Sequence, residues 1–480
     1  MTESLTPRQR WLALYLLCTG VLMIVLDTTV VTVALPSIQS ALGFSDTALV
    51  WVMNAYMLTF GGFLLLGGRM GDLYGNRRWF LRGLVVFTVA SLACGVAHSQ
   101  WLLVVARAVQ GLGGAVVTAV ALALIMNLFP DTSDRAKAMG VYGFICAAGG
   151  SLGEILGGVL THLMSWEWIF LINLPIGVAV YVFCLRLLPV DREPAQRQRL
   201  DVAGALTVTA GLMLAVYAII EGNAAGWLSA QTLGLLGLGA LLLVLFLVIE
   251  SRVRDPLMPL HLFKLRNLAT ANVIAVLWSA GMFAWFVISA LYMQRVLAYN
   301  PLEVGLAFLP ADAIMAVFSL WLSARLVIRY GIRAPLWVGL TIAAIGLALF
   351  ARAPQDGNYV LHVLPGMLLL GMGGGMAFNP LLLAAMNDVS EDLSGLASGI
   401  VNTSFMMGGA LGLAVLAALA DGWTRDLLAA GAEPAAALNG GYQFAFALGA
   451  AFALLGALLG AWLIRSRPQA VAEAAVHGPL

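Results

Sequence analysis

Apolar runs of about twenty residues recur along the whole 480-residue chain, and they constrain its fold more than any other feature. The hydrocarbon core of a bilayer is about 30 Å thick, so a helix needs about 20 apolar residues to cross it. Hydrophobic residues make up 61% of the chain and charged residues only 10%, which is more apolar surface than a soluble protein of this length can bury. We therefore expect an all-α polytopic membrane protein.

Fourteen such runs are predicted to span the membrane. They cover 11–36, 46–67, 79–98, 100–126, 136–162, 167–188, 201–220, 230–250, 269–295, 302–324, 335–352, 359–384, 393–420 and 440–465. The first run is too long for the apolar region of a cleavable signal peptide, so we expect it to be retained. The net charge of +1 gives no sign of a nucleic-acid partner.

Lys and Arg residues are distributed unevenly between the two predicted sides of the membrane. If the N-terminus is cytoplasmic, all but four of the 25 Lys and Arg residues fall at cytoplasmic segments; the four are Arg107, Arg295, Arg352 and Arg425. Cytoplasmic loops carry the excess of Lys and Arg in membrane proteins. This pattern favours fourteen spans, with both termini in the cytoplasm.

The sequence also repeats itself. "GRMGDLYGNR" at 68–77 and "ARLVIRYGIR" at 324–333 share four residues without gaps, and each follows a span on the cytoplasmic side. We therefore expect two pseudo-symmetric six-helix bundles around a site near the membrane midplane, as in many secondary transporters. The expected domains are an N-terminal bundle (1–188), a linker with two additional helices (189–266), and a C-terminal bundle with a cytoplasmic tail (267–480).

Three charged residues lie inside predicted spans of the first half. Asp27, Arg107 and Glu154 each fall eight or nine residues from the outer end of a span. A rise of about 1.5 Å per residue puts all three at a similar depth, near the midplane. Charged side chains in a bilayer face the bundle interior and mark functional sites by default, so we expect these three to share a hydrated pocket and to couple transport to protons. A fixed Asp–Arg pair that only holds helices together is the alternative.

The second half supplies further candidates. Asp312 falls about ten residues inside its span and is a candidate cation or proton site, with a local hydrogen-bonding role as the alternative. Aromatic rings could bind flat lipophilic ligands, and amides within spans could bind ligands or join helices. The candidate substrate-binding residues are Asp27, Glu154, Asp312, Asn54, Tyr56, Trp278, Trp285, Phe286, Asn379 and Asn402.

A stripe of small residues at four-residue spacing, Gly149, Gly153 and Gly157, lies in the fifth span. Such a stripe lets another helix approach closely, so we expect it to pack against a neighbour. The sequence contains no metal-ligand spacing, nucleophile–base pair or phosphate-binding loop, which argues against an enzyme and against a bound metal.

Six segments resemble the major facilitator superfamily, and specifically its fourteen-spanner family of drug/proton antiporters. They are "LDTTVVTVALP" at 26–36, "GGRMGDLYGNRR" at 67–78, "ARAVQGLGGA" at 106–115, "GGSLGEILGG" at 149–158, "WIFLINLPIG" at 168–177 and "GLASGIVNTSFMMGGALG" at 395–412. Two departures stand out. Glu154 occupies a position that is usually proline in this family, and Leu73 and Asn76 replace residues that tend to be basic.

The resemblance implies a conformational role for the loop residues Gly68, Asp72, Gly75, Arg77 and Arg78. In the family the loop aspartate joins the two halves at their cytoplasmic ends. We therefore expect Asp72 to accept hydrogen bonds from the start of the thirteenth span, near Ser394, where the helix dipole favours an anion. The resemblance further implies a bacterial cytoplasmic membrane, a monomer, and no cofactor beyond the proton gradient.

The predicted function is a proton-coupled antiporter that exports lipophilic, cationic or zwitterionic small molecules by alternating access. Asp27 and Glu154 are expected to bind proton and substrate in alternation, while Arg107 adjusts their affinity for protons. One alternative is an exporter dedicated to a single antibiotic or metabolite. Another, of a different class, is a lipid-handling or sensory membrane protein without proton coupling.

Overall fold

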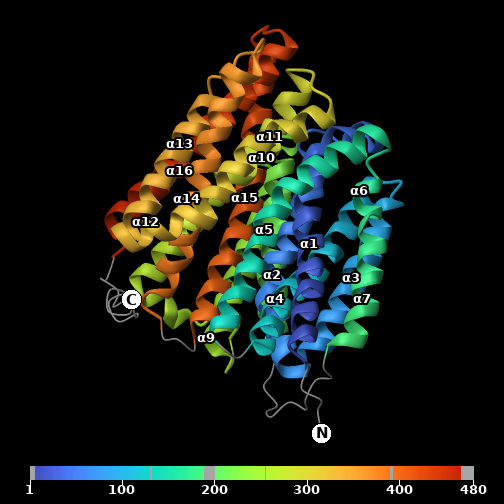
Figure 1. Ribbon diagram of the computed structural model, residues 1–480. Helices are drawn as coiled ribbons and strands as arrows, with labels where there is room; N and C mark the ends of the chain where they lie inside the picture. Colours follow the sequence, from blue (N-terminus) through green and yellow to red (C-terminus); the bar gives the residue numbers. More distant parts are fainter. Residues whose placement is uncertain (1–5, 130–131, 189–199, 255, 390–392, 466–480) are drawn as a thin grey trace.

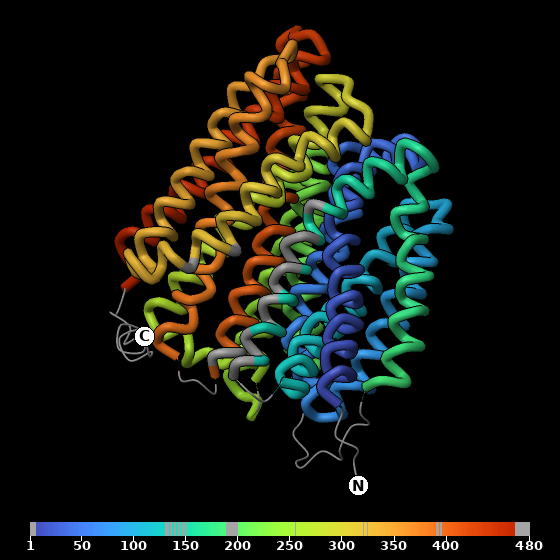
Figure 2. The backbone as a smooth tube through the Cα atoms, viewed as in Figure 1, coloured from blue at the N-terminus to red at the C-terminus, as the bar shows by residue number. Residues whose placement is uncertain are grey.

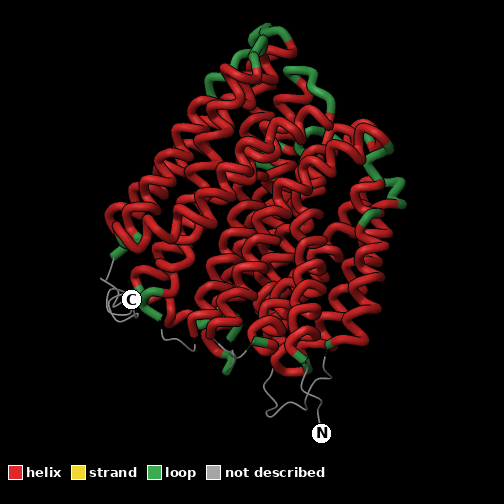
Figure 3. The backbone as a smooth tube through the Cα atoms, viewed as in Figure 1, coloured by secondary structure: helices red, strands yellow, loops and turns green. Residues whose placement is uncertain are grey.

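The structure is a computed structural model that describes residues 6–129, 132–188, 200–254, 256–389 and 393–465 (Figure 1). Across these residues the chain is helical, with short loops and turns between the helices (Figure 3). Twelve helices in this part of the chain are long and apolar enough to cross a membrane. The prediction of an all-helical membrane protein is therefore confirmed.

Six predicted spans form the N-terminal half. Its elements are α1 (Pro7–Leu42), the 3₁₀-helix η1 (Ala48–Val50), α2 (Trp51–Tyr74), α3 (Asn76–Gly95), α4 (Gln100–Leu128), α5 (Thr132–Leu163), α6 (Trp168–Leu171) and α7 (Asn173–Leu187). The linker contributes α8 (Val202–Ala225), α9 (Ala230–Arg252) and the 3₁₀-helix η2 (Leu260–Lys264).

The remaining six predicted spans form the C-terminal half. Its elements are α10 (Arg266–Arg295), α11 (Pro301–Val317), the π-helix η3 (Phe318–Leu322), α12 (Ser323–Tyr330), α13 (Arg333–Phe350), the π-helix η4 (Tyr359–Val363), α14 (Leu364–Met386), α15 (Ser394–Ala429) and α16 (Pro434–Leu463). The predicted linker stretch 189–199 and the tail from 466 onward lie outside the described residues.

Helices occupy all fourteen predicted ranges, but two of these helices are not among the twelve candidate spans of the described chain. In α5 the described apolar part is Leu152–Leu163, which is shorter than a full span. In the range 301–330 the π-helix η3 separates the 17-residue α11 from α12. The number fourteen therefore stays a prediction.

The two halves have the same arrangement of helix contacts. In the N-terminal half α1 packs on α5 and α7, and α4 packs on α2 and α3; in the C-terminal half α10 packs on α15 and α16, and α14 packs on α11 and α13. The halves meet where α2 contacts α15 and where α5 contacts α11, two interfaces that this symmetry relates to each other. The sequence repeat thus corresponds to a repeat in three dimensions.

Local sequence signals explain the helix boundaries. Thr6 and Asn300 each form a capping box at the start of α1 and α11, followed by a proline in the first turn. The loop repeat places Gly75 (φ +103°) between α2 and α3, and Gly331 (φ +72°) after α12. A side chain would strain the backbone at these φ values, so glycine permits both tight turns.

We call the end of the bundle where α1 begins and α16 ends the proximal end, and the opposite end the distal end. Figure 1 shows the N-terminal half in blue to green and the C-terminal half in yellow to red, side by side along the bundle. In the backbone tube of Figure 2, α1 in dark blue rises from the end where the N-terminus lies through the N-terminal half. The linker helices α8 and α9 pack on each other, and α8 contacts both α2 and α15.

Candidate functional site

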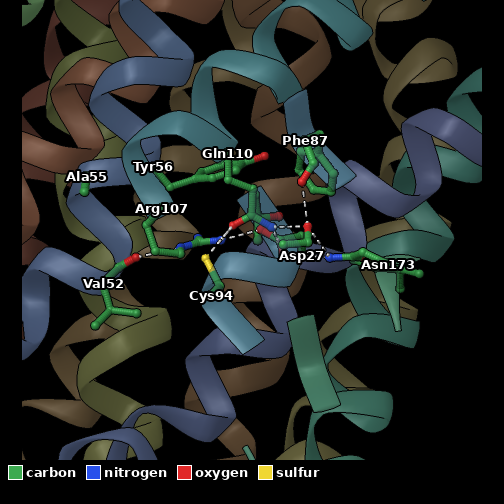
Figure 4. A network of polar contacts seen from close by, with 12 residues as sticks. Asp27, Val52, Ala55, Tyr56, Phe87, Cys94, Arg107, Gln110 and Asn173 are labelled. Atoms are coloured by element: carbon green, nitrogen blue, oxygen red, sulfur yellow. Dashed lines mark hydrogen bonds and ion pairs between the residues drawn. The ribbon is translucent and has the colours of Figure 1, made fainter. Parts of the chain in front are cut away.

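Asp27 lies on α1 in the interior of the N-terminal half and is completely buried. Its carboxylate forms an ion pair with Arg107 Nη1 of α4 and accepts hydrogen bonds from Gln110 Nε2 (2.7 Å) and Asn173 Nδ2 (3.1 Å) (Figure 4). Three donors therefore surround one carboxylate. This arrangement satisfies an ionised group away from water and holds α1, α4 and α7 together.

Arg107 is also fully buried. Its Nε donates to the carbonyl oxygen of Val52 on α2 (2.9 Å), and Nη1 also donates to Gln110 Oε1 (2.7 Å). The guanidinium stacks over the ring of Tyr56, 4.4 Å from its centroid, and lies 5.6 Å from that of Phe170. Stacking on an aromatic face stabilises a guanidinium that has lost its water.

Ser91 of α3 completes the cluster. Its hydroxyl accepts from Gln110 Nε2 (2.8 Å) and Asn173 Nδ2 (3.3 Å), and donates to the carbonyl of Phe87 (2.8 Å). We call Asp27, Ser91, Arg107, Gln110 and Asn173 the Asp27 network. It connects four helices of one half, and the Arg107 contact to α2 adds a fifth.

Sequence reasoning identified two members of this network and missed three. Gln110 is three residues after Arg107, on the same face of α4, so helical spacing could have found it. Asn173 lies inside the family-like segment 168–177, which indicated the segment but not the residue. Ser91 gave no signal, because a serine within an apolar span commonly bonds its own helix.

The structure does not bring Glu154 to the Asp27 network, in contrast to the expected single pocket. Asp27 points toward α4 and α7, whereas Glu154 lies on the side of α5 that faces α11. The charged group that acts on Glu154 is the Asp312 carboxyl of α11, and a hydrogen bond between two carboxyl groups requires that one of them carry a proton. Gly153 packs beside Leu26, so Asp27 and Glu154 lie at a similar level of the bundle, but counting residues carries no information about the direction in which a side chain points.

The glycine stripe of α5 packs as expected, and its partner is α1. A Cβ added at Gly153 would lie 3.1 Å from the carbonyl oxygen of Leu26, and one at Gly157 would lie 2.8 Å from the Cα of Val30. Gly149 contacts Val25 in the same way. Successive residues of a helix point about 100° apart, so with Gly153 facing α1 the next residue, Glu154, faces away from α1 and toward α11.

The C-terminal half carries an aromatic cluster at the place that corresponds to the Asp27 network. Trp278 contacts Phe378 and Phe405, with ring centroids 6.0 and 5.4 Å away. Trp285 packs on Phe286 (4.4 Å), and both packed rings contact Phe308. A pocket of about 10 Å³, enough for one water molecule, is lined by Trp278, Met282, Trp285, Met315, Ala343, Leu347, Leu370 and Gly374.

The amides among the candidates have different surroundings. Asn379 donates to the carbonyl of Ser319 in η3 (2.8 Å), and Asn402 donates to the carbonyl of Ser398 in its own helix (3.1 Å). These bonds are structural in the present conformation. Asn54 and Tyr56 of α2 are buried, and neither the Asn54 amide nor the Tyr56 hydroxyl has a hydrogen-bond partner among the described residues.

The loop of the first repeat, between α2 and α3, lies at the proximal end. Gly75 forms the turn, Arg77 Nη2 donates to the carbonyl of Leu185 in the last turn of α7 (2.5 Å), and Arg69 lies near Asp72. Gly68 and Arg78 lie in the adjoining turns of α2 and α3. The side chain of Ser394 lies outside the described part of the chain, so a contact from Asp72 to the start of α15 stays a prediction.

Polar contacts that the sequence reasoning missed join the halves at the distal end. Arg295 at the end of α10 donates to Asp46 Oδ1 in the loop after α1 (2.8 Å) and to Gln39 Oε1 of α1. Arg295 also contacts the Tyr442 hydroxyl of α16 (3.3 Å), and Gln294 donates to the carbonyl of Val33 (3.0 Å). The distal end is therefore closed by bonds between the halves.

Comparison with known proteins assigns the chain to a family. The model of the Major Facilitator Superfamily matches residues 17–413. The chain belongs to the Major Facilitator Superfamily. A crystal structure of an auto-inhibited peptide transporter of the POT family superposes with a TM-score of 0.68 over 96% of this chain and 98% of that one, at 17% identity, so the two share a fold.

Among curated relatives of this superfamily member, the puromycin resistance protein of Streptomyces alboniger is 40% identical over 97% of this chain and 93% of its own length. The cephamycin export protein of Amycolatopsis lactamdurans is 38% identical, with 84% of each chain covered. The multidrug resistance protein Stp of Mycobacterium tuberculosis is 35% identical, over 84% of this chain and 74% of its own.

Proposed function

We propose that this superfamily member is a proton-coupled antiporter that exports lipophilic, cationic or zwitterionic small molecules by alternating access. The observation that carries the proposal is the presence of acids on three inward-facing helix surfaces of a membrane transporter: Asp27, Glu154 and Asp312. Buried intramembrane acids are unfavourable unless they are paired or bind a cation or proton. Relatives named for drug resistance and export support efflux as the direction of transport.

The contacts in the N-terminal half support a role for Asp27 as a binding site that becomes available to a proton or a cation only after the network around it has rearranged. In the present conformation its carboxylate has Arg107, Gln110 and Asn173 as donors, so a proton or a cationic substrate can bind only after at least one donor moves away. Arg107 would then compete with the incoming cation for Asp27. Because a proton and a substrate cation would each take the place of Arg107 at the same carboxylate, only one of them can bind at a time, as antiport requires.

The C-terminal half supports the substrate class. Trp278 and Trp285 line the small pocket together with the adaptable thioether side chains of Met282 and Met315, and Phe286 packs on Trp285. Asp312 lies three residues before Met315, on the same side of α11. Rings and an acid together attract lipophilic cations, with Asn54 and Tyr56 as further polar groups.

A second candidate is an exporter dedicated to one compound. The puromycin resistance relative favours it, since it shares the highest identity of the three relatives above across nearly the whole chain, and its name refers to a single antibiotic. The relative named for multidrug resistance favours broad specificity. The chain's own aromatic cluster fits either candidate, so a compound panel must decide.

We further propose the arrangement in the membrane. All fourteen helical segments cross the bilayer, α8 and α9 are additional to two six-helix bundles, and both termini lie on the cytoplasmic side of a bacterial inner membrane. The domains are then 1–188, 189–266 and 267–480, working as a monomer without a cofactor. The unequal distribution of Lys and Arg supports this orientation, which makes the distal end the outer end.

The test is transport by the purified protein in proteoliposomes that contain a pH indicator. Puromycin, a lipophilic quaternary ammonium dye and a neutral dye are added in turn, and both proton movement and compound movement are followed. We expect proton movement with the cationic compounds, and Asp27→Asn should abolish gradient-driven transport while membrane insertion is retained. Unchanged transport by Asp27→Asn, or compound movement without any proton movement, would contradict the proposal and favour a protein without proton coupling.

A further inference from the structure

Glu154 and Asp312, which we call the interface acid pair, belong to different halves of the transporter. Their helices α5 and α11 touch backbone to backbone: a Cβ added at Gly305 would lie 2.5 Å from the carbonyl oxygen of Glu154, and one at Gly158 would lie 2.7 Å from that of Pro301. The helices run in opposite directions, and Cα–Cβ bonds tilt toward the helix N-terminus. The Glu154 side chain therefore leans toward the proximal end and Asp312 toward the distal end, so the two carboxyl groups converge.

The pair is enclosed. Glu154 is 1% exposed and Asp312 is 8% exposed. Among the described residues no hydrogen-bond donor reaches either carboxyl oxygen of Glu154, and the group that acts on it is the Asp312 carboxyl. Two ionised carboxylates offer only acceptors, whereas one proton between them supplies a donor and removes the repulsion between two buried negative charges.

The second interface between the halves shows that helix packing does not require these acids. Gly412 of α15 packs on α10 as Gly153 of α5 packs on α1, so Leu413 corresponds to Glu154. Gly371 of α14 packs on the carbonyl of Ala311 as Gly111 of α4 packs on that of Tyr56, so Met57 corresponds to Asp312. Leu413 and Met57 are both buried apolar residues. The α2–α15 interface thus has the same helix packing as the α5–α11 interface, with apolar side chains in place of the two acids.

The other titratable groups on the surrounding elements are engaged elsewhere or lie at the helix ends. Asp27 of α1 pairs with Arg107 of α4, and Arg295 of α10 pairs with Asp46. On and beside α11, Tyr359 of η4 donates to the Ala307 carbonyl (2.9 Å), Tyr292 of α10 donates to the Pro354 carbonyl (2.7 Å), and Glu303 caps α11. On α5, His162 is exposed at the distal end, the Lys137–Asp134 pair lies near the proximal end, and Tyr142 lies between the proximal end and Glu154. Arg8, Arg10 and Tyr15 of α1 and Arg266 of α10 lie toward the proximal end. The sequences of α6, α14 and η3 contain no Asp, Glu, His, Lys or Arg.

We propose that Glu154 and Asp312 together hold one proton when the distal end is closed, and that this shared proton is what permits the two halves to close there. The proposal rests on the proposed function and makes it specific. Opening the distal end separates α5 from α11, water reaches both acids, and the proton leaves. Closing the distal end takes up one proton from the water on that side.

This assignment gives the coupling a direction. With the distal end outside, protons at the more acidic outer face favour closure, and the proton is carried to the conformation that faces the cytoplasm. A substrate cation bound near Asp312 replaces the proton as the positive charge, because the two acids can share only one compensating charge. Proton and substrate would thus compete for the same two acids, as antiport requires.

The experiment measures distal opening directly in the full-length protein in lipid nanodiscs. Spin labels are attached to cysteines introduced at His98 in the loop after α3 and at Ala430 after α15, which are exposed residues of opposite halves, with the four native cysteines replaced. Pulsed electron paramagnetic resonance then gives the populations of short and long distances between the labels from pH 5.5 to 8.5. One linked proton changes their ratio by up to about tenfold per pH unit over the range in which the pair titrates.

We expect the wild-type distances to lengthen as pH rises. Glu154→Gln and Asp312→Asn, which supply a permanent donor, should stay short at every pH. The double variant Glu154→Leu with Asp312→Met copies the apolar pair of the second interface and should behave likewise, which guards against a folding defect in the amide variants. Glu433→Gln, at an exposed acid before α16, is the matched control and should respond like the wild type.

Wild-type distances that do not respond to pH, or a Glu154→Gln variant that keeps the wild-type response, would overturn the shared proton. Transport assays on the same preparations separate the two proposals. If the wild type exchanges compound for protons while Glu154→Gln retains the pH response, the shared proton fails and proton-coupled export stands. If the wild type exchanges nothing for protons, proton-coupled export fails whatever the distances do.

Discussion

Single residues in the N-terminal half show how a charge pair is kept inside an apolar bundle. Asp27 accepts from three side chains, and Arg107 has Asp27, Gln110 and Val52 as partners. A buried ion pair contributes little beyond what well-packed apolar side chains would contribute, but loss of one partner leaves an uncompensated charge. Replacing one residue of the pair is therefore expected to lower the stability of the protein far more than replacing both residues together.

We predict that Arg107→Met destabilises the protein by about 3–5 kcal/mol, because Asp27 is left buried with only the neutral donors Gln110 and Asn173. Thermal unfolding of the detergent-purified protein, followed by fluorescence, measures the effect. The double variant Asp27→Asn with Arg107→Met should recover part of the lost stability, since no charge then remains. A double variant that is less stable than Arg107→Met would show that the pair does not act as a unit.

At the scale of helices, the contact between α5 and α11 depends on the absence of side chains. Gly305 lies against the backbone of Glu154, which cannot move away without displacing the helix. In an exposed helix position, replacing glycine by alanine stabilises the helix by up to about 1 kcal/mol. Whether a glycine-to-alanine substitution raises or lowers stability therefore depends on where the glycine lies.

We predict that Gly305→Ala lowers the unfolding temperature and increases the population of the distally open conformation. Gly237→Ala is the matched control, because a Cβ at Gly237 of α9 would meet nothing within 4 Å, and this variant should be as stable as the wild type or more so. Thermal unfolding and the distances between labels at the distal end measure the two effects. An equal response of the two variants would mean that the α5–α11 contact is loose.

At the scale of the whole molecule, the number of membrane crossings decides on which side each site lies. We predict that a cysteine at Leu228, in the loop between α8 and α9, reacts with a membrane-impermeant reagent from outside intact cells. A cysteine at Arg254, after α9, should react only after the membrane is permeabilised, because both ends of an inserted helix pair lie on the cytoplasmic side. The reverse pattern would place the linker helices in the opposite orientation.

Sequence patterns predicted much of this architecture, because hydropathy and the internal repeat both depend on properties that a linear pattern contains. The turn at Gly75 and its counterpart at Gly331, and the packing of the Gly149–Gly157 stripe, follow from residue size and spacing. That Asp27 and Glu154 lie at a similar level of the bundle also follows from counting residues. The direction in which each side chain points does not, because it depends on the rotation of one helix against others, and so Glu154 was assigned to the wrong neighbours.

The π-helix η3 has a consequence for evolution of the site. The loop repeat aligns Arg69 with Arg325, an offset of 256, whereas the glycine contacts above η3 align Tyr56 with Ala311, an offset of 255. One inserted residue, whose extra carbonyl at Ser319 accepts from Asn379, accounts for the difference. The wider turn of the π-helix accommodates the extra residue, so the positions beyond it keep the same orientation in both halves while the proximal turn stays in place. The additional residue therefore left the two halves in register, and the acid of the second half differs from its apolar counterpart Met57 by the side chain alone.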